Sequence, residues 1–501
     1  MRPPRPGTIG RVTALERLVR AAARPGPRAV LVLALAFAVF VGSGASAASL
    51  SGDTAVYAQV GREIVERGDP TRLTFDGEPY RTKPPLVLWV EALAFSVLGF
   101  TESAARLPAR LFGLATVALL LLFVGRTHGR RAGFLAALAC ATWLVFQRAA
   151  STPRLDPALA FFTLAVLAAF VRIDRLGPTP LRALGLGALL GLAVLSKGPP
   201  GVLGALALAV GAPLAGRGRL LLRVAPLALL AAVAVGGSWY ALQTAREGRV
   251  FWDALRRDLG RDTAEIQGGL AAITLYFQDV VLPAFPFVIA AIGGAALTVR
   301  RLRRARGRGL PEALLLALTA SLLVTLPFLR MHYARYFAVI VPALAGLGAI
   351  WAAPAFRGLS RRFPRVSAHR VVAAGVAVAV CVGYPLVLLL GFYAPRDTYA
   401  ELESLARVYR REAPGVRAWP TWSPLQEDGD PQAIVAGLRA ATLFYLDLRL
   451  VPFDSKDPAQ PRLVLFRHRP PGRPDSAERF QARVHPVVVA QESGFTLYRV
   501  P

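Results

Sequence analysis

The sequence predicts a polytopic α-helical membrane protein of about eleven transmembrane helices, with a small C-terminal α/β domain outside the membrane. Hydrophobic residues make up 54 % of the 501 residues and charged residues only 18 %, whereas soluble domains carry about 25 % charged residues. The apolar residues come in blocks of about 20 residues, the length that spans a bilayer. Short Arg clusters separate these blocks, as in the cytoplasmic loops of membrane proteins. This composition excludes a disordered chain, which requires low hydrophobicity.

The net charge of +28 comes from 59 Lys and Arg against 31 Asp and Glu. In a soluble protein this balance indicates nucleic-acid binding. Here the accumulation of Arg and Lys in cytoplasmic loops explains it, so no nucleic-acid partner is predicted. Both cysteines, Cys140 and Cys381, lie inside apolar blocks. A disulfide framework or a cysteine metal site is therefore not expected.

The apolar blocks divide the chain into three regions. Residues 1–28 are rich in Arg and Pro and are predicted to be a cytoplasmic basic N-terminus. Residues 29–393 are predicted to form a multi-span transmembrane domain, and residues 394–501 a periplasmic C-terminal domain. We interpret the first block as an uncleaved anchor because many spans follow it, although its end also resembles a signal-peptidase site. The expected spans are 29–50, 107–125, 133–150, 157–171, 183–196, 199–215, 224–242, 281–299, 311–329, 336–353 and 371–393.

Block 84–100 is ambiguous, because it is short, opens with two prolines and contains Glu91. If it crosses the membrane, all five Arg clusters fall on the outer face; if it lies along the outer interface, all five are cytoplasmic, as membrane proteins prefer. We therefore predict a juxtamembrane or re-entrant helix. The clusters are Arg126/Arg130/Arg131, Arg172/Arg175, Arg217/Arg219/Arg223, Arg300/Arg301/Arg303/Arg304/Arg306/Arg308 and Arg357/Arg361/Arg362/Arg365.

This topology places the loops 51–106 and 243–280 and the whole C-terminal region on the outer face. In that region, alternating apolar and polar residues predict strands at 462–467 and 495–500, and a helix is expected at 397–411. The region lacks the polar constellation of the first loop. We therefore expect it to be dispensable for a chemical step.

The first outer loop holds the leading candidate residues. Asp53 directly follows the first span, where a carboxylate can face a lipid headgroup; an N-cap of the following helix is the alternative interpretation. Lys83 and Lys197 are two of only three lysines in a chain that otherwise uses Arg, and each precedes Pro or Gly-Pro at an outer boundary. A compact ammonium suits a phosphate oxygen, and a snorkelling interfacial cation is the alternative.

Three further boundaries carry polar residues. Asp156, followed by Pro157, opens a span, where an ionisable group needs a partner or a polar cavity; the same pair is also a common start of a helix. Arg106 and the pair Arg335-Tyr336 lie at the outer starts of other spans. They are either substrate contacts or ordinary interfacial anchors.

The order and spacing of these motifs resemble the C-type membrane glycosyltransferases of glycosyltransferase family 39, which include the aminoarabinose transferases of lipid A and the protein O-mannosyltransferases. The likeness covers residues 30–350 in several motifs. They are Asp53…Tyr57-Ala58, Arg67-Gly68-Asp69, Tyr80…Lys83-Pro84-Pro85-Leu86…Trp89, Gly99, Arg106-Leu107-Pro108, Arg154-Leu155-Asp156 and Ser196-Lys197-Gly198-Pro199.

The resemblance implies a sugar donor on a polyprenyl phosphate. It implies that Asp53 is the base, that Asp156 is the second acidic residue and that Lys83 lies at the lipid phosphate, with Tyr57 and Tyr80 near the donor. Transfer from a lipid phosphate needs a base for the acceptor and cations for the leaving phosphate. The remaining candidates for substrate binding are Arg106, Lys197, Arg335 and Tyr336.

Two departures from the family pattern concern the acidic residues. The family usually has Glu at the position of Thr54, and often at that of Thr82. The change at Thr82, together with the absence of His from 243–280, argues against a bound divalent metal. No cofactor and no metal are therefore expected to be required.

The predicted function is an inverting glycosyltransferase of the bacterial inner membrane, with its active site facing the periplasm. It would move a sugar from an undecaprenyl phosphate carrier to a hydroxyl or phosphate of lipid A, a protein or another glycan. One alternative is a transporter or flippase for lipid-linked saccharides, which typically shows inverted repeats and charges at mid-span. The other is a non-catalytic protein that binds polyprenyl lipid, which the change at Thr54 keeps open.

Overall fold

The computed structural model describes most of the bundle and parts of the C-terminal region. The described residues are 36, 50, 52–264, 287–304, 309–325, 334–362, 398–414, 418–422, 443–444, 449–452, 463–467, 487–492 and 495–499. Most of the expected span 29–50 and all of 371–393 lie outside these residues. The number of eleven spans therefore stays a prediction.

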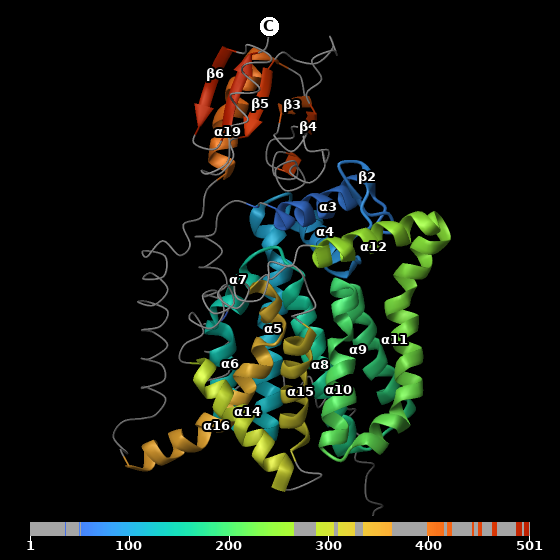
Figure 1. The fold of residues 1–501 in the computed structure, drawn as a ribbon, viewed down its shortest axis with the longest axis vertical. Helices are drawn as coiled ribbons and strands as arrows, with labels where there is room; N and C mark the ends of the chain where they lie inside the picture. Colours follow the sequence, from blue (N-terminus) through green and yellow to red (C-terminus); the bar gives the residue numbers. More distant parts are fainter. Residues whose placement is uncertain are drawn as a thin grey trace, which may run out of the picture.

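A bundle of apolar helices forms the body of the molecule (Figure 1). Within the described residues, four helices are long and apolar enough to cross a membrane: α5 (Glu102–His128), α8 (Asp156–Leu176), α9 (Pro180–Lys197) and α11 (Gly218–Glu247). The pair α6 (Arg130–Thr142) and α7 (Leu144–Ser151), bent by 65°, makes a fifth if it is one span. The bundle also contains η1 (Pro199–Val202), α10 (Leu203–Leu214), α14 (Phe287–Arg304), α15 (Leu310–Thr325), η5 (Ala334–Val339) and α16 (Val341–Arg362).

The ambiguous block 84–100 forms the short helix α4 (Leu86–Leu98), which packs on α3 (Asp53–Arg67) and α5. Its 13 residues extend about 20 Å at 1.5 Å per residue, less than the roughly 30 Å of a hydrocarbon core. The length of α4 thus agrees with a helix that does not cross the membrane. Helices α3 and α12 (Arg249–Ala264) lie across the upper end of the bundle (Figure 1).

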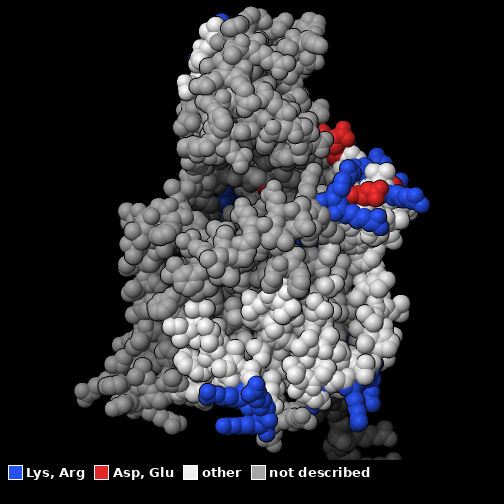
Figure 2. Space-filling view, in the orientation of Figure 1, with Lys and Arg blue, Asp and Glu red and all other residues white. Residues whose placement is uncertain are grey.

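The two ends of the bundle differ in charge. Three helices carry Arg in their last turns: Arg126 in α5, Arg175 in α8 and Arg304 in α14. Figure 2 shows Lys and Arg gathered at this lower end, beneath a belt of surface without charged residues. A second patch, which contains both basic and acidic residues, lies at the upper end beside α12. Where the structure describes them, the Arg residues of these clusters and the candidate site residues are therefore at opposite ends of the bundle.

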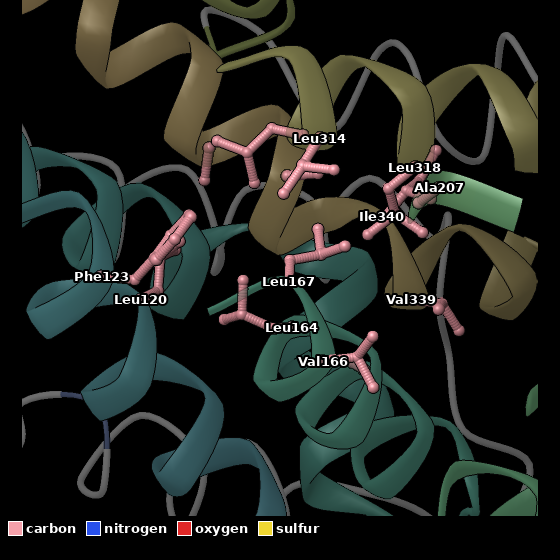
Figure 3. Close-up of a cluster of buried hydrophobic side chains, with 14 of the residues drawn as sticks. Leu120, Phe123, Leu164, Val166, Leu167, Ala207, Leu314, Leu318, Val339 and Ile340 are labelled. Carbon is pink, nitrogen blue, oxygen red and sulfur yellow. The ribbon is translucent and has the colours of Figure 1, made fainter. Parts of the chain in front are cut away.

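Close helix contacts need small residues. A Cβ at Gly187 of α9 would lie 2.0 Å from the backbone O of Ala228 on α11, and one at Gly294 of α14 would lie 2.1 Å from the O of Leu347 on α16. Small residues let helix backbones approach in this way within membranes. Larger side chains fill the centre, where Leu120, Phe123, Leu164, Leu167, Leu314 and Leu318 meet (Figure 3).

The described part of the C-terminal region contains a five-stranded sheet in the order β4-β3-β5-β7-β6. Strand β3 pairs in parallel with β4 and β5, whereas β7 pairs antiparallel with β5 and β6. The elements are α19 (Thr398–Glu412), β3 (Ala418–Trp422), β4 (Arg449–Pro452), β5 (Leu463–Arg467), β6 (Val487–Glu492) and β7 (Phe495–Arg499). The strands expected at 462–467 and 495–500 and the helix expected at 397–411 are confirmed.

Candidate functional site

Asp53 is the first residue of α3, and its carboxylate accepts from a side chain far along the chain. Gly52, with φ of 56°, occupies the N-cap position without a side-chain cap hydrogen bond. The N-cap interpretation of Asp53 is therefore wrong. Instead, Asp53 Oδ2 lies 2.8 Å from Nη2 of Arg335, which belongs to η5 between α15 and α16. The Asp53 side chain is 47 % exposed, so it remains accessible to an acceptor molecule.

A buried ion pair lies beside this contact. Asp156, at the start of α8, accepts a hydrogen bond from Nζ of Lys197, the last residue of α9. The two side chains are 4 % and 13 % exposed. The Lys197 ammonium also lies 5.0 Å from the centre of the Tyr336 ring, and the Arg335 guanidinium lies 5.8 Å from the same ring. Lys197 is thus bound to a buried carboxylate and does not extend to water.

Lys83 is held by a residue that sequence reasoning missed. Its Nζ lies 2.7 Å from Oδ2 of Asp258 on α12, and both side chains are about three quarters buried. Nothing in the local sequence distinguishes Asp258, because it lies among arginines of an amphipathic segment. The first outer loop is fixed nearby by α11, where Arg246 donates to the backbone O of Thr71 at 2.8 Å.

Two tyrosines contribute hydroxyl groups to the same region. Burial raises the pKa of Tyr57 well above its usual range, and the neighbouring Tyr80 and Asp53 raise it further. Burial also raises the pKa of Tyr80, against a hydrogen bond with Thr82 that lowers it. Both phenols therefore stay protonated at neutral pH and can donate a hydrogen bond to an anionic oxygen.

Arg154 is a further cation of the cluster. It lies in the connection between α7 and α8, and its charge interacts with those of Arg335, Asp156 and Asp53. Its position two residues before Asp156, at the same boundary, was the signal that could have identified it as a site residue.

These contacts bring residues from six separate segments into one cluster. In the described part of it, four cations (Lys83, Arg154, Lys197 and Arg335) face three carboxylates (Asp53, Asp156 and Asp258). The cluster therefore carries one positive charge in excess, which favours binding of an anion.

Arg106, another predicted site residue, bonds to groups outside this cluster. Its Nη1 donates to the backbone O of Ser151 at 3.2 Å and its Nη2 lies 2.9 Å from Oε2 of Glu102. These bonds tie α5 to the end of α7. A role for Arg106 in substrate binding stays a prediction. Among the described residues, no three His, Cys, Asp or Glu side chains come together as metal ligands.

The sequence matches known proteins across most of its length. Residues 82–239 match the family described as dolichyl-phosphate-mannose-protein mannosyltransferase. The undecaprenyl phosphate-alpha-4-amino-4-deoxy-L-arabinose arabinosyl transferase of Pectobacterium carotovorum subsp. carotovorum (strain PC1) is 28 % identical over 364 residues. The match covers 69 % of this chain and 62 % of that relative, so the chain spans less than two thirds of the relative's length.

Solved structures show the same fold. ArnT from Cupriavidus metallidurans, at 19 % identity, superimposes with TM-scores of 0.69 in the apo state and 0.68 bound to undecaprenyl phosphate. Each of the two superpositions covers 94 % of this chain and 97 % of the ArnT chain. The oligosaccharyltransferase of Archaeoglobus fulgidus is less similar, with a TM-score of 0.52 over 77 % of this chain and 58 % of that chain. The chain has the fold of ArnT, and its predicted resemblance to the C-type membrane glycosyltransferases of glycosyltransferase family 39 is confirmed.

Proposed function

We propose that this chain is an inverting glycosyltransferase that moves a sugar from an undecaprenyl phosphate carrier to a hydroxyl or phosphate group of lipid A, a protein or a glycan. One observation carries the proposal: the cation-rich cluster around Asp53 lies at the end of the bundle away from the Arg clusters. The names of the relatives support the donor, since one is an undecaprenyl phosphate arabinosyl transferase and another binds undecaprenyl phosphate.

The chemistry follows from the roles that the cluster can fill. The acceptor oxygen attacks the anomeric carbon, the bond from that carbon to the phosphate oxygen breaks, and the phosphate leaves with the electron pair. A single displacement of this kind inverts the anomeric centre. Asp53 takes the acceptor proton, and Lys83, Arg154 and Lys197 stabilise the charge on the leaving phosphate. Because a carboxylate is a weak base towards a hydroxyl, these cations supply most of the barrier lowering.

The two alternative functions, a transporter and a non-catalytic lipid-binding protein, require charged residues at different places. A transporter needs charged groups near the middle of the membrane, whereas the described ion pairs of this cluster lie at the upper end of the bundle, at helix ends, in loops and on α12. A non-catalytic lipid-binding protein needs the cations and no base. The exposed carboxylate of Asp53, held 2.8 Å from Arg335, favours the enzyme.

The proposal is tested by comparing lipid extracts and glycoconjugates of wild-type and deletion cells by mass spectrometry. We expect the donor lipid to accumulate in the deletion strain and one modified acceptor to disappear, which identifies sugar and acceptor together. Purified protein in nanodiscs should then release undecaprenyl phosphate from that donor, with or without a chelator. Identical extracts and no release of the carrier phosphate contradict the proposal.

We expect the cluster to face the periplasm, because the opposite end carries the Arg clusters. With Cys140 and Cys381 replaced by Ser, a cysteine at Arg126 or Arg304 should react with an impermeant maleimide only in inverted vesicles. Arg256→Cys on the exposed surface of α12 is the matched control and should react in intact spheroplasts. Labelling of Arg126→Cys in spheroplasts contradicts this topology.

Asp258 should compete with the donor for Lys83. A carboxylate 2.7 Å from the ammonium repels a phosphate on the same ammonium, by about 1 kcal/mol once solvent screening is counted. We therefore expect Asp258→Asn to lower the KM for the donor about three- to tenfold. Asp253→Asn, on the same helix but 61 % exposed in an ion pair of 3.9 Å, should leave KM unchanged. A higher KM in Asp258→Asn contradicts the competition.

A further inference from the structure

A two-residue piece of the C-terminal region, Leu443–Phe444, docks on the helix that carries Asp53. The Phe444 side chain is only 7 % exposed. Its ring centre lies 6.0 Å from that of Phe95 on α4. It belongs to a buried cluster with Leu50, Ala55, Ala58, Ala94, Phe95, Ala104 and Ala105. Three helices, α3, α4 and α5, therefore contribute to the contact.

The composition of this cluster explains why a phenyl ring fits. Five of the residues that share this buried cluster with Phe444 are alanines, contributed by α3, α4 and α5. Small side chains at neighbouring positions leave a hole between helices that one large side chain can fill. Ala55 and Ala58 are three residues apart and so lie on one face of α3.

Backbone hydrogen bonds fix the same piece from the side. Arg62, four residues after Ala58 on that face of α3, donates from Nη1 to the backbone O of Leu443 at 3.5 Å and of Phe444 at 3.4 Å. Its Nε bonds Glu66 at 2.6 Å, which orients the guanidinium. The backbone of the docked piece is thus bound to α3, while its ring lies beside Phe95 of α4 in the buried cluster that also contains Ala55 and Ala58 of α3.

The opposite face of α3 packs on the bundle. Tyr57, Val60 and Ile64 belong to a second buried cluster with residues of α8, α9 and α11. Helix α3 therefore packs between the bundle on one side and residues Leu443–Phe444 on the other. Its first turn carries Asp53 and its second Tyr57, so any shift of α3 moves both.

We propose that Phe444 is a positioning residue for turnover. Its ring packs among Ala55, Ala58, Ala94, Ala104 and Ala105, which we call the alanine socket. By filling this socket it holds α3, and with it the carboxylate of Asp53, in the position that the reaction with the donor requires. This inference rests on the proposed glycosyltransferase function. It also replaces the expectation from sequence that the region after residue 394 is dispensable for the chemical step. That expectation considered only polar side chains, whereas this contact is made by an apolar ring in a buried cluster and by two backbone oxygens that accept from Arg62.

The test is Phe444→Ala in the full-length protein. We expect kcat to fall at least tenfold, because a displacement of about 1 Å in a reacting group can cost 10²-fold. Binding of undecaprenyl phosphate should stay within about threefold, since Lys83, Arg154 and Lys197 lie on other elements. Phe444→Leu should keep most of the activity. Val487→Ala, 64 % exposed on β6, is the matched control within the C-terminal sheet and should be silent.

Two measurements keep the outcome decisive. Hydrogen exchange of the α3 amides should accelerate in Phe444→Ala, a result that does not depend on which reaction the protein catalyses. Arg62→Gln removes the guanidinium that bonds the backbone of Leu443 and Phe444, at a side chain that is 19 % exposed, and should lower kcat about threefold with unchanged donor binding. If Phe444→Ala and Arg62→Gln both keep the wild-type kcat and the wild-type rate of α3 amide exchange, the inference is overturned. Failure of the wild-type protein to transfer any sugar overturns the proposed function instead.

Discussion

Replacing Asp53 by Asn should reduce turnover by about 10² to 10⁴-fold, the usual contribution of a positioned general base. Asn keeps the size of the side chain and can still accept from Arg335, but it cannot take the acceptor proton. Binding of undecaprenyl phosphate should change by less than about threefold, because the cations that face the phosphate remain in place. Single-turnover kinetics with the donor lipid and a binding assay in nanodiscs measure the two effects separately.

Asp69→Asn is a matched control for this variant. Asp69 lies in the same loop, where it accepts from the hydroxyl and backbone N of Thr71, and these bonds lower its pKa. It belongs to a turn and should have little influence on kcat. Retained turnover in Asp53→Asn removes Asp53 from the mechanism, and equal losses in both variants point to a structural effect of the loop.

Replacing Lys197 by Ala should have the second largest effect and should reduce both stability and donor affinity. Its partner Asp156 is 4 % exposed, and removing one member of a buried pair costs about 3–5 kcal/mol of unfolding free energy. Because the charges of Arg335 and Arg154 also act on Asp156, we expect the lower value. Denaturant unfolding in detergent measures the loss of stability.

The Lys83 pair provides the comparison. Lys83 and Asp258 are 22 % and 24 % exposed, so Lys83→Ala should cost less than about 1 kcal/mol of stability while donor affinity falls about tenfold. Lys83→Arg should restore only part of that affinity, because a guanidinium fork does not reproduce a compact ammonium. Unchanged donor affinity in Lys83→Ala removes Lys83 from the site.

A double variant separates charge from packing at the buried pair. Asp156→Ala combined with Lys197→Ala should recover part of the stability lost in Lys197→Ala, since no unpaired charge remains. If the double variant is as unstable as the single one, the loss reflects packing at the ends of α8 and α9 rather than the unpaired carboxylate.

The sequence by itself determined the features that depend on local composition. The apolar blocks predicted the helices of the bundle, and alternation predicted β5 and β7. The placement of Arg predicted that block 84–100 does not cross, and the 13 residues of α4 are compatible with that prediction. The motifs also identified Asp53, Lys83, Asp156, Lys197 and Arg335, which the fold brings together. These signals are local because burial in lipid and pairing in a sheet act on every residue of a segment.

Only the tertiary structure decided which residues face one another. Lys83 meets Asp258 across 175 positions, and Arg62 meets Leu443 across 381. Neither partner carries a local pattern that singles it out. The same limitation explains why local sequence also offered Asp53 as an N-cap, a position that Gly52 occupies in the structure. An ion pair, or the packing of an aromatic ring between helices, forms only if the side chains point toward each other. The packing of whole helices sets those directions.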